Sequence, residues 1–164
     1  MDLTVREYQE GWENEIKSKL ESQFPGKVTV TKTETRRVYA QVDRSVSKAV
    51  CQYLHDELSF EHCATVIGVD LGEAEQKMQV VYHIDNYTLY KGVVVELTVD
   101  VPYDDLHIET VSDIWGGANW HERETWELFG IVFDHHPRLE RLLTPDTYEF
   151  FPMRKSYKLR EDKR

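Results

Sequence analysis

The chain has 164 residues, a length that fits one domain with a substantial core. Its 40% hydrophobic content is that of a globular protein, and its formal net charge of −10 argues against a general nucleic-acid binder, which needs a basic face. The two cysteines, Cys51 and Cys63, are too few and too far apart for a cluster or zinc motif, so we expect core thiols in a reducing, intracellular compartment.

The chain opens with a helical pattern that is followed by two strand patterns. Apolar residues over positions 4–24 recur at spacings of three and four, which predicts an amphipathic helix. Thr4 and Glu7 have the spacing of a capping box at its start. Residues 27–31 and 36–42 alternate apolar and polar side chains, so we expect two strands, each with one buried face.

A second helix and three further strands are predicted in the middle of the chain. Residues 43–58 return to helical spacing, with one apolar stripe: Val46, Ala49, Val50, Tyr53 and Leu54. Residues 63–71, 77–85 and 92–101 have strand patterns, and the connection over residues 72–75 is typical of a hairpin. This order predicts an α+β domain with a mixed or antiparallel sheet of about five strands and helices on one face.

A third, short helix is predicted near the end of the chain. Asn119 is its expected N-cap, Glu122 occupies the capping-box position three residues later, and Gly130 ends the helix. Glu122, Trp126 and Phe129 then fall on one side of the helix, which directs a carboxylate inward with two aromatic rings. Because a buried carboxylate needs cations and hydrogen bonds, we infer a largely buried acidic–basic network that fixes a loop against the domain or another protein.

The residues after this helix supply many cations without a regular pattern. These cations are His135, His136, Arg138, Arg141, Arg154 and Lys155. Residues 133–164 contain three prolines and lack periodicity, so we expect an extended, ordered docking segment that needs a surface to lie on. The chain therefore divides into an α+β core, residues 1–132 with the motif helix 119–130, and this docking tail, residues 133–164, within the same domain.

Two interpretations of this arginine-rich tail are open. In one, three arginines of the tail neutralise three glutamates of the helix: Arg138, Arg141 and Arg154 against Glu122, Glu124 and Glu127. In the other, arginine and tryptophan side chains anchor a protein–protein interface. The proximity of Trp115, Trp120 and Trp126 in the sequence favours the interface.

The side chains that suggest chemistry do not form a catalytic pattern. His121, Glu124, His135 and His136 are metal-ligand types, but the second histidine of a His-Glu-x-x-His motif is absent. Glu122 and Glu124 diverge by about 200° around a helix, so they cannot act on one substrate atom. We expect no active site and no metal site in this chain. The competing classes are a stand-alone metal-dependent enzyme built on these His and Glu residues and a free-standing adaptor.

Hydropathy argues against a membrane-spanning chain. No apolar run reaches the ~18 residues that a membrane helix needs, and the longest, residues 92–101, contains Glu96 and Asp100. Asp2 and Arg6 interrupt the apolar core that a signal peptide would need. We therefore expect a soluble chain that meets a membrane only through partners.

The last third of the chain resembles a known family. It contains Trp-x-Glu-Arg-Glu-x-Trp-Glu-Leu-Phe-Gly-Ile-x-Phe from Trp120, His-Pro-x-Leu-x-Arg-Leu-Leu from His136, and Pro-Met-Arg-Lys-x-Tyr from Pro152. These strings resemble the C-subunit family of respiratory complex I, which extends to reduced-deazaflavin dehydrogenases and membrane-bound hydrogenases. The family usually has Gly where this chain has His135, and a positive φ at that position costs His a steric penalty.

The resemblance implies a non-redox scaffold subunit in the peripheral arm of an ion-pumping oxidoreductase, on the cytoplasmic side of the cell membrane. The subunit would brace the quinone-reducing module while electrons pass from NADH, reduced deazaflavin, ferredoxin or hydrogen to quinone. The implied partners are a quinone-site (D-type) subunit and a small iron–sulfur (B-type) subunit, which hold the quinone and the clusters, whereas this chain holds no cofactor and binds no nucleic acid. Structural and interface roles, not catalytic ones, carry over to Trp120, Glu122, Arg123, Glu124, Trp126, Glu127, Phe129, Gly130, His136, Pro137, Arg138, Arg141, Pro152, Arg154, Lys155 and Tyr157.

Overall fold

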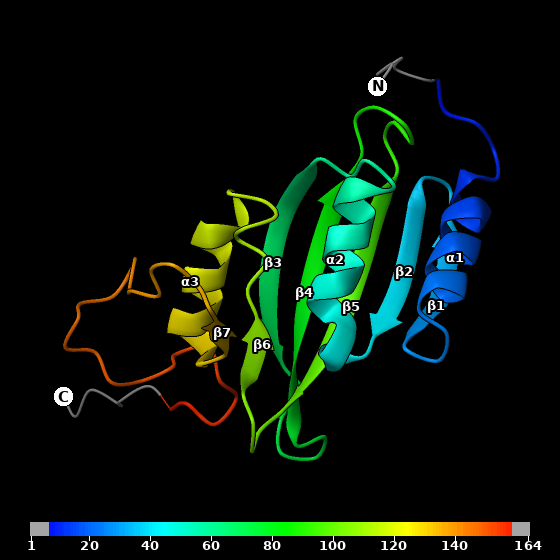
Figure 1. Ribbon diagram of the computed structural model, residues 1–164. Helices are drawn as coiled ribbons and strands as arrows, with labels where there is room; N and C mark the ends of the chain where they lie inside the picture. The colour runs from blue at the N-terminus through cyan, green and yellow to red at the C-terminus, as the bar shows by residue number, and fades with distance from the viewer. Residues whose placement is uncertain (1–6, 159–164) are drawn as a thin grey trace.

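A computed structural model describes residues 7–158 and has a five-stranded sheet at its centre (Figure 1). The strands are β1 (Val28–Glu34), β2 (Arg37–Val42), β3 (His62–Asp70), β4 (Lys77–Asp85) and β5 (Val94–Pro102). Their order across the sheet is β1-β2-β5-β4-β3, with β2 and β5 parallel and the other neighbours antiparallel. The predicted mixed sheet of five strands is confirmed.

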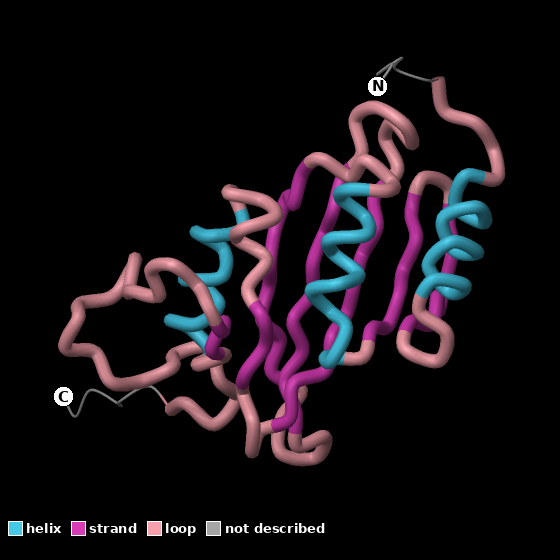
Figure 2. The backbone as a smooth tube through the Cα atoms, in the orientation of Figure 1, coloured by secondary structure: helices cyan, strands magenta, loops and turns pink. Residues whose placement is uncertain are grey.

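Two helices cover one face of this sheet (Figures 1 and 2). They are α1 (Trp12–Gln23) and α2 (Ser47–Asp56), the second preceded by a 3-10 turn, η1 (Arg44–Val46). A third helix, α3 (Ala118–Phe129), lies beside the edge strand β3. The chain is a single α+β domain, as the order of its elements predicts.

The core lies between the sheet and helices α1 and α2, and it follows the alternation along the strands. Every second side chain of β4 and β5 is buried: Met78, Val80, Tyr82 and Ile84, and Val95, Leu97, Val99 and Val101. The buried positions of α2 are three and four residues apart: Ser47, Val50, Cys51 and Leu54. Ala49, predicted in this stripe, is exposed, because it lies about 200° around the helix from Cys51.

Both cysteines lie in this core. Cys51 and Cys63 are buried free thiols, as predicted. Burial raises the pKa of the Cys63 thiol to about 12. The thiols therefore stay protonated at neutral pH and pack as small apolar groups.

Helix α1 is shorter than its periodicity predicts. It begins at Trp12, and the preceding Gly11 has a φ of 99°, in the left-handed region. A left-handed residue interrupts a right-handed helix, so the prediction of a helix through residues 7–11 is wrong. Thr4, the predicted capping residue, lies outside the described residues. Tyr8 still packs on the core, with its ring edge-on to Trp12 at a centroid distance of 5.8 Å.

Two short strands that the sequence patterns do not predict join the tail to the core. They are β6 (His107–Glu109) and β7 (Val132–Asp134), which pair in parallel and bury Ile108 and Phe133. The prediction of a tail without strands is therefore wrong at β7, because three residues carry too little alternation to be recognised. Residues 135–158, called the tail from here on, contain no helix or strand.

Candidate functional site

Helix α3 is the element on which the candidate site is built. It begins at Ala118, and Gly117 before it makes no side-chain cap, so the predicted N-cap at Asn119 is wrong because Asn119 already lies in the first turn. The end of α3 is as predicted. Gly130 has a φ of 78°, and its amide donates to the Trp126 carbonyl at 2.7 Å.

Gly68 of β3 allows α3 to approach the sheet edge closely. A Cβ at Gly68 would lie 2.6 Å from the Phe129 ring and 2.9 Å from the Thr125 methyl group, distances that a real side chain does not tolerate. The Thr125 hydroxyl donates to the Val66 carbonyl of β3 at 3.1 Å. Helix and edge strand therefore form a rigid base for the segments that lie on them.

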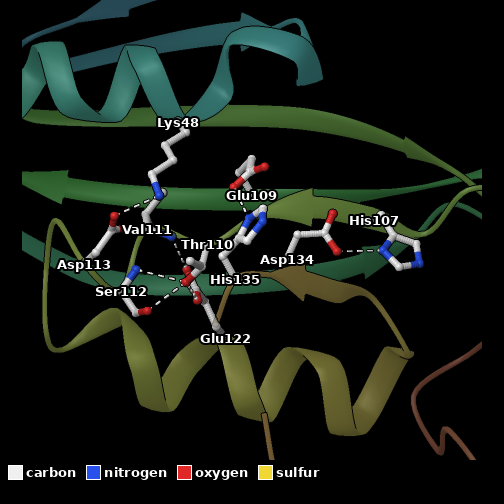
Figure 3. Close-up of polar contacts among 10 residues, drawn as sticks. All are labelled: Lys48, His107, Glu109, Thr110, Val111, Ser112, Asp113, Glu122, Asp134 and His135. Carbon is white, nitrogen blue, oxygen red and sulfur yellow. Dashed lines mark hydrogen bonds and ion pairs between the residues drawn. The ribbon is translucent and has the colours of Figure 1, made fainter. Parts of the chain in front are cut away.

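Glu122 is fully buried on α3 and fixes the loop that precedes the helix (Figure 3). Its carboxylate accepts a hydrogen bond from the Val111 amide at 2.7 Å and another from the Thr110 hydroxyl. Burial raises the pKa of this carboxyl to about 7, although both hydrogen bonds favour the charged form. Glu122 therefore changes its charge in the neutral pH range.

His136 lies beside Glu122 as a neutral ring. Its Nδ1 accepts a hydrogen bond from the Arg138 amide at 3.0 Å, so the proton is on Nε2. Nε2 lies 3.2 Å from the Asn119 carbonyl and 3.8 Å from the Glu122 carboxylate. Burial lowers the pKa of His136, and the first residues of the tail are thus held on α3 without a formal cation.

Glu127, also fully buried, holds the middle of the tail. Its carboxylate accepts hydrogen bonds from the amides of Leu142 at 2.7 Å and Leu143 at 3.0 Å. The amide and the hydroxyl of Thr144 donate to it as well. Burial works against the charged form, yet these hydrogen bonds keep the pKa of the carboxyl below its ordinary value.

Asp70, at the end of β3, holds the far part of the tail. It accepts hydrogen bonds from the Lys155 amide at 2.7 Å, the Gly72 amide at 2.8 Å and the Tyr103 hydroxyl. Despite burial, these bonds lower the pKa of the carboxyl. Sequence reasoning missed Asp70, since 85 residues separate it from Lys155 and its only local signal is the spacing to Gly72 in a turn.

Arg154 closes the C-terminal end of α3. Its Nε donates to the Phe129 carbonyl at 2.6 Å, where a helix end favours a cation, and its guanidinium lies 4.3 Å from the centre of the Phe151 ring. A Cβ at Gly130 would overlap both the guanidinium and this ring. Gly130 is therefore required for its left-handed φ and for the close approach of Arg154.

Two further arginines join the tail to the tryptophans of α3. Arg123 Nε donates to the Glu140 carbonyl at 3.0 Å, and its guanidinium lies 5.2 Å from the Trp120 ring centre. The Arg141 guanidinium lies 5.6 Å from the Trp126 ring centre. Arg123 of α3 thus contacts a carbonyl of the tail, and Arg141 of the tail contacts a ring of α3.

The predicted acidic–basic network is wrong in its chemistry. Among the described residues, no arginine pairs with Glu122 or Glu127, which instead accept hydrogen bonds from amides and hydroxyls. Arg138 pairs with Glu140 at the surface at 2.7 Å, and Glu124 is exposed. Backbone groups satisfy the buried carboxylates without burying further charges, which avoids the desolvation cost of an ion pair.

His135 adopts the left-handed turn that Gly would favour. Its φ is 63°, and its ring Nδ1 lies 3.0 Å from the Glu109 carboxylate. His107 Nδ1 lies 2.8 Å from Asp134 on the same pair of short strands (Figure 3). Two histidine–carboxylate pairs therefore bridge β6 and the end of β7 at the surface.

Four large apolar side chains are exposed on α3 and the tail, each by 55–66%. They are Trp120, Leu143, Phe150 and Met153, which we call the docking face. Met153 and the exposed Ile67 of β3 line a hollow of about 270 Å³ between β3 and α3. The remaining predicted site residues lie along the tail: Pro137 exposed, Pro152 half-buried, and Tyr157 with its hydroxyl 2.8 Å from that of Tyr148.

Two of the metal-ligand side chains singled out in the sequence lie at the same place. His121 and Glu124 line the same hollow between β3 and α3. Within residues 7–158, no group of three or more His, Cys, Asp or Glu side chains is arranged to hold a metal ion. No helix in this range has the length and apolar character of a membrane span.

Comparisons with known proteins match both the sequence and the fold. A family model described as "Respiratory-chain NADH dehydrogenase, 30 Kd subunit" matches residues 40–163. The C subunit of the F(420)H(2) dehydrogenase of Methanosarcina mazei is 39% identical over 140 residues, which are 84% of this chain and 87% of that protein. The C subunit of the NADH-quinone oxidoreductase of Saccharopolyspora erythraea is 42% identical over 121 residues, 72% of this chain but only 48% of that longer protein. Among solved structures, a trypsin-resistant fragment of Nqo5 superposes with a TM-score of 0.64 at 25% identity, covering 77% of this chain and 98% of the fragment.

Proposed function

Because the chain belongs to the family of the 30-kDa subunit of respiratory-chain NADH dehydrogenase, we propose that it is a structural subunit of a membrane-associated, ion-translocating oxidoreductase. In this role it braces the quinone-reducing module while electrons pass from NADH or a related donor to quinone. Its partners are a quinone-site (D-type) subunit and a small iron–sulfur (B-type) subunit, which hold the quinone and the clusters. The protein lies on the cytoplasmic side of the membrane and holds no cofactor of its own.

The observation that carries this proposal is the fixed tail with its exposed apolar side chains. Three buried carboxylates, Asp70, Glu122 and Glu127, bind backbone amides of the tail and of the loop before α3. A segment fixed in this way loses little conformational entropy when it binds a partner. The docking face adds exposed aromatic and aliphatic side chains to this fixed segment, which is the composition of an interface core.

The proposal is tested by purification of the N-terminally tagged chain from gently solubilised membranes, followed by mass spectrometry. A matched pair of variants locates the interface: Leu143→Ser on the docking face and Tyr87→Ser, at a similarly exposed position in the loop between β4 and β5. We expect quinone-site and iron–sulfur subunits in fixed ratio with the wild type and with Tyr87→Ser, and less of both with Leu143→Ser.

Three results would count against the proposal. Recovery of the chain alone with stoichiometric metal would support a stand-alone metal-dependent enzyme, and recovery alone without metal would support a free adaptor. Equal recovery of partners with Leu143→Ser and Tyr87→Ser would place the interface away from the docking face.

A reduced-deazaflavin donor is the second candidate for the same complex. The C subunit of the Methanosarcina mazei F(420)H(2) dehydrogenase is 39% identical and matches over 87% of its length, while the Geobacter metallireducens NADH-quinone counterpart is 35% identical and matches over 86% of its length. The purified complex would then oxidise reduced deazaflavin and leave NADH unreacted. Oxidation of NADH alone would assign the NADH version.

A further inference from the structure

A hollow of about 870 Å³ lies within the last part of the tail, residues 148–158. Its apolar walls are the rings of Tyr148, Phe150, Phe151 and Tyr157. The first two rings meet edge-on at 5.7 Å between centroids, and Phe150 and Tyr157 lie 6.4 Å apart. The rings therefore support one another, and the hollow is a formed feature of the tail.

The polar groups of this hollow are mostly hydrogen-bond donors. The tyrosine hydroxyls lie 2.8 Å apart, so one donates to the other and the accepting tyrosine keeps its own hydrogen for a further partner. Arg154 donates its Nε to the Phe129 carbonyl and also lines the hollow. Lys158 is exposed at the rim and makes no ion pair within the described residues.

The charge of this hollow is opposite to that of the chain. It is lined by two cations, Arg154 and Lys158, and one carboxylate, Glu149, and the Arg141 guanidinium lies 5.8 Å from the Tyr148 ring centre. The whole chain has a formal net charge of −10. A local excess of cations and donors on an acidic protein favours an anionic partner group at this place.

We propose that this hollow receives an acidic segment of a partner protein, with a carboxylate at Lys158 and the tyrosine hydroxyls and an adjacent apolar side chain on the rings. The inference rests on the proposed function and states the chemistry of the partner that docks on the tail. A basic segment would meet the two cations that line the hollow, Arg154 and Lys158, with the Arg141 guanidinium beside the Tyr148 ring. An anionic bilayer presents a flat surface, which does not enter a hollow.

The first test reverses the charge at the rim. The tagged complex is purified with wild type, Lys158→Glu and Lys91→Glu, a matched control at an exposed lysine in the loop between β4 and β5, and is washed with increasing salt. We expect Lys158→Glu to lower partner recovery roughly tenfold at moderate salt, since reversal replaces an attraction with a repulsion. Lys91→Glu is expected to match the wild type. Equal recovery with both variants would overturn the inference.

The second test identifies the partner segment. Phe150, which is 55% exposed in the hollow, is replaced by p-benzoylphenylalanine, and the complex is irradiated before mass spectrometry. A cross-linked peptide with Asp or Glu within two residues of the attachment point supports the inference. A basic peptide, a lipid adduct or no adduct overturns it.

The two proposals fail in different ways. If no partner protein is recovered with the wild type, the proposed function fails. If partners are recovered but Lys158→Glu behaves as Lys91→Glu, or if the cross-link is not to an acidic peptide, the proposed function stands and only the chemistry of this hollow is refuted.

Discussion

Replacement of Glu127 by Gln is expected to release the middle of the tail from α3 while the core stays folded. Glu127 accepts hydrogen bonds from the amides of residues 142–144, and a hydrogen bond to a charged acceptor contributes ~1.5–3 kcal/mol. Gln keeps one acceptor oxygen but directs an NH₂ donor at the remaining amides. We therefore expect the free energy of local opening to fall by ~2–4 kcal/mol.

Amide hydrogen exchange measures this change directly. A loss of this size corresponds to a roughly 30- to 700-fold faster exchange of the amides of Leu142, Leu143 and Thr144. Glu124→Gln is the matched control, because Glu124 is exposed on the same helix, and it should leave these rates unchanged. Unchanged exchange in Glu127→Gln would refute the conclusion that this carboxylate holds the tail.

Three further predictions follow from the core, α3 and the short strands. The pKa of Glu122 in the folded state is about 7, above its unfolded value, so the folded state binds an extra proton and the free energy of unfolding should fall by ~3 kcal/mol as pH rises from 4.5 to 7.5. Urea titrations at both pH values should show this fall in the wild type but not in Glu122→Gln. The same change in the free energy of unfolding for both proteins would contradict this prediction. Gly68→Ala should lower the free energy of unfolding by ~1–3 kcal/mol, because the added methyl group overlaps the Phe129 ring. Gly117→Ala is the control, because Gly117 has open space around it, and calorimetry should show little change in its melting temperature. Equal melting temperatures of the two variants would argue against close contact of α3 with β3. His135→Gly should raise the free energy of unfolding by ~0.5–1 kcal/mol, because Gly adopts the left-handed backbone without strain. His135→Ala keeps that strain and should not raise the free energy of unfolding. Chemical denaturation measures both variants, and equal effects would show that loss of the imidazole ring, not the backbone, causes the change.

The sequence predicts most of the sheet because alternation is a local signal. The strands β1 to β5 lie within a few residues of the predicted ranges, and Met78, Val80, Tyr82 and Ile84 are buried as expected. The start of α1 fails, since apolar spacing continues through residues whose backbone is broken by the left-handed Gly11. Strands β6 and β7 fail because each is too short to carry a period.

The candidate site is predictable in position but not in its contacts. A local rule identifies Gly130 as a helix stop, the family resemblance questions the backbone at His135, and both residues have a positive φ. Long-range partners cannot be read in this way, as the contact of Asp70 with the Lys155 amide shows. The sequence also does not show whether a buried glutamate accepts hydrogen bonds from backbone amides or from arginines. It shows the types of side chain, but not which backbone amides lack a partner.

The position of α3 beside β3 also bears on self-association. A bare sheet edge is a template on which a second chain can add a strand and begin polymerisation. At β3, α3 lies along this edge, and the Thr125 hydroxyl occupies the Val66 carbonyl. At the opposite edge, β1 has an irregularity between Val30 and Lys32 that interrupts regular pairing, and Lys32 itself adds a charge there. Displacement of α3 by a mutation would therefore expose an edge to which strands of other chains can add, and it would also loosen the tail. Such variants would aggregate before they unfold.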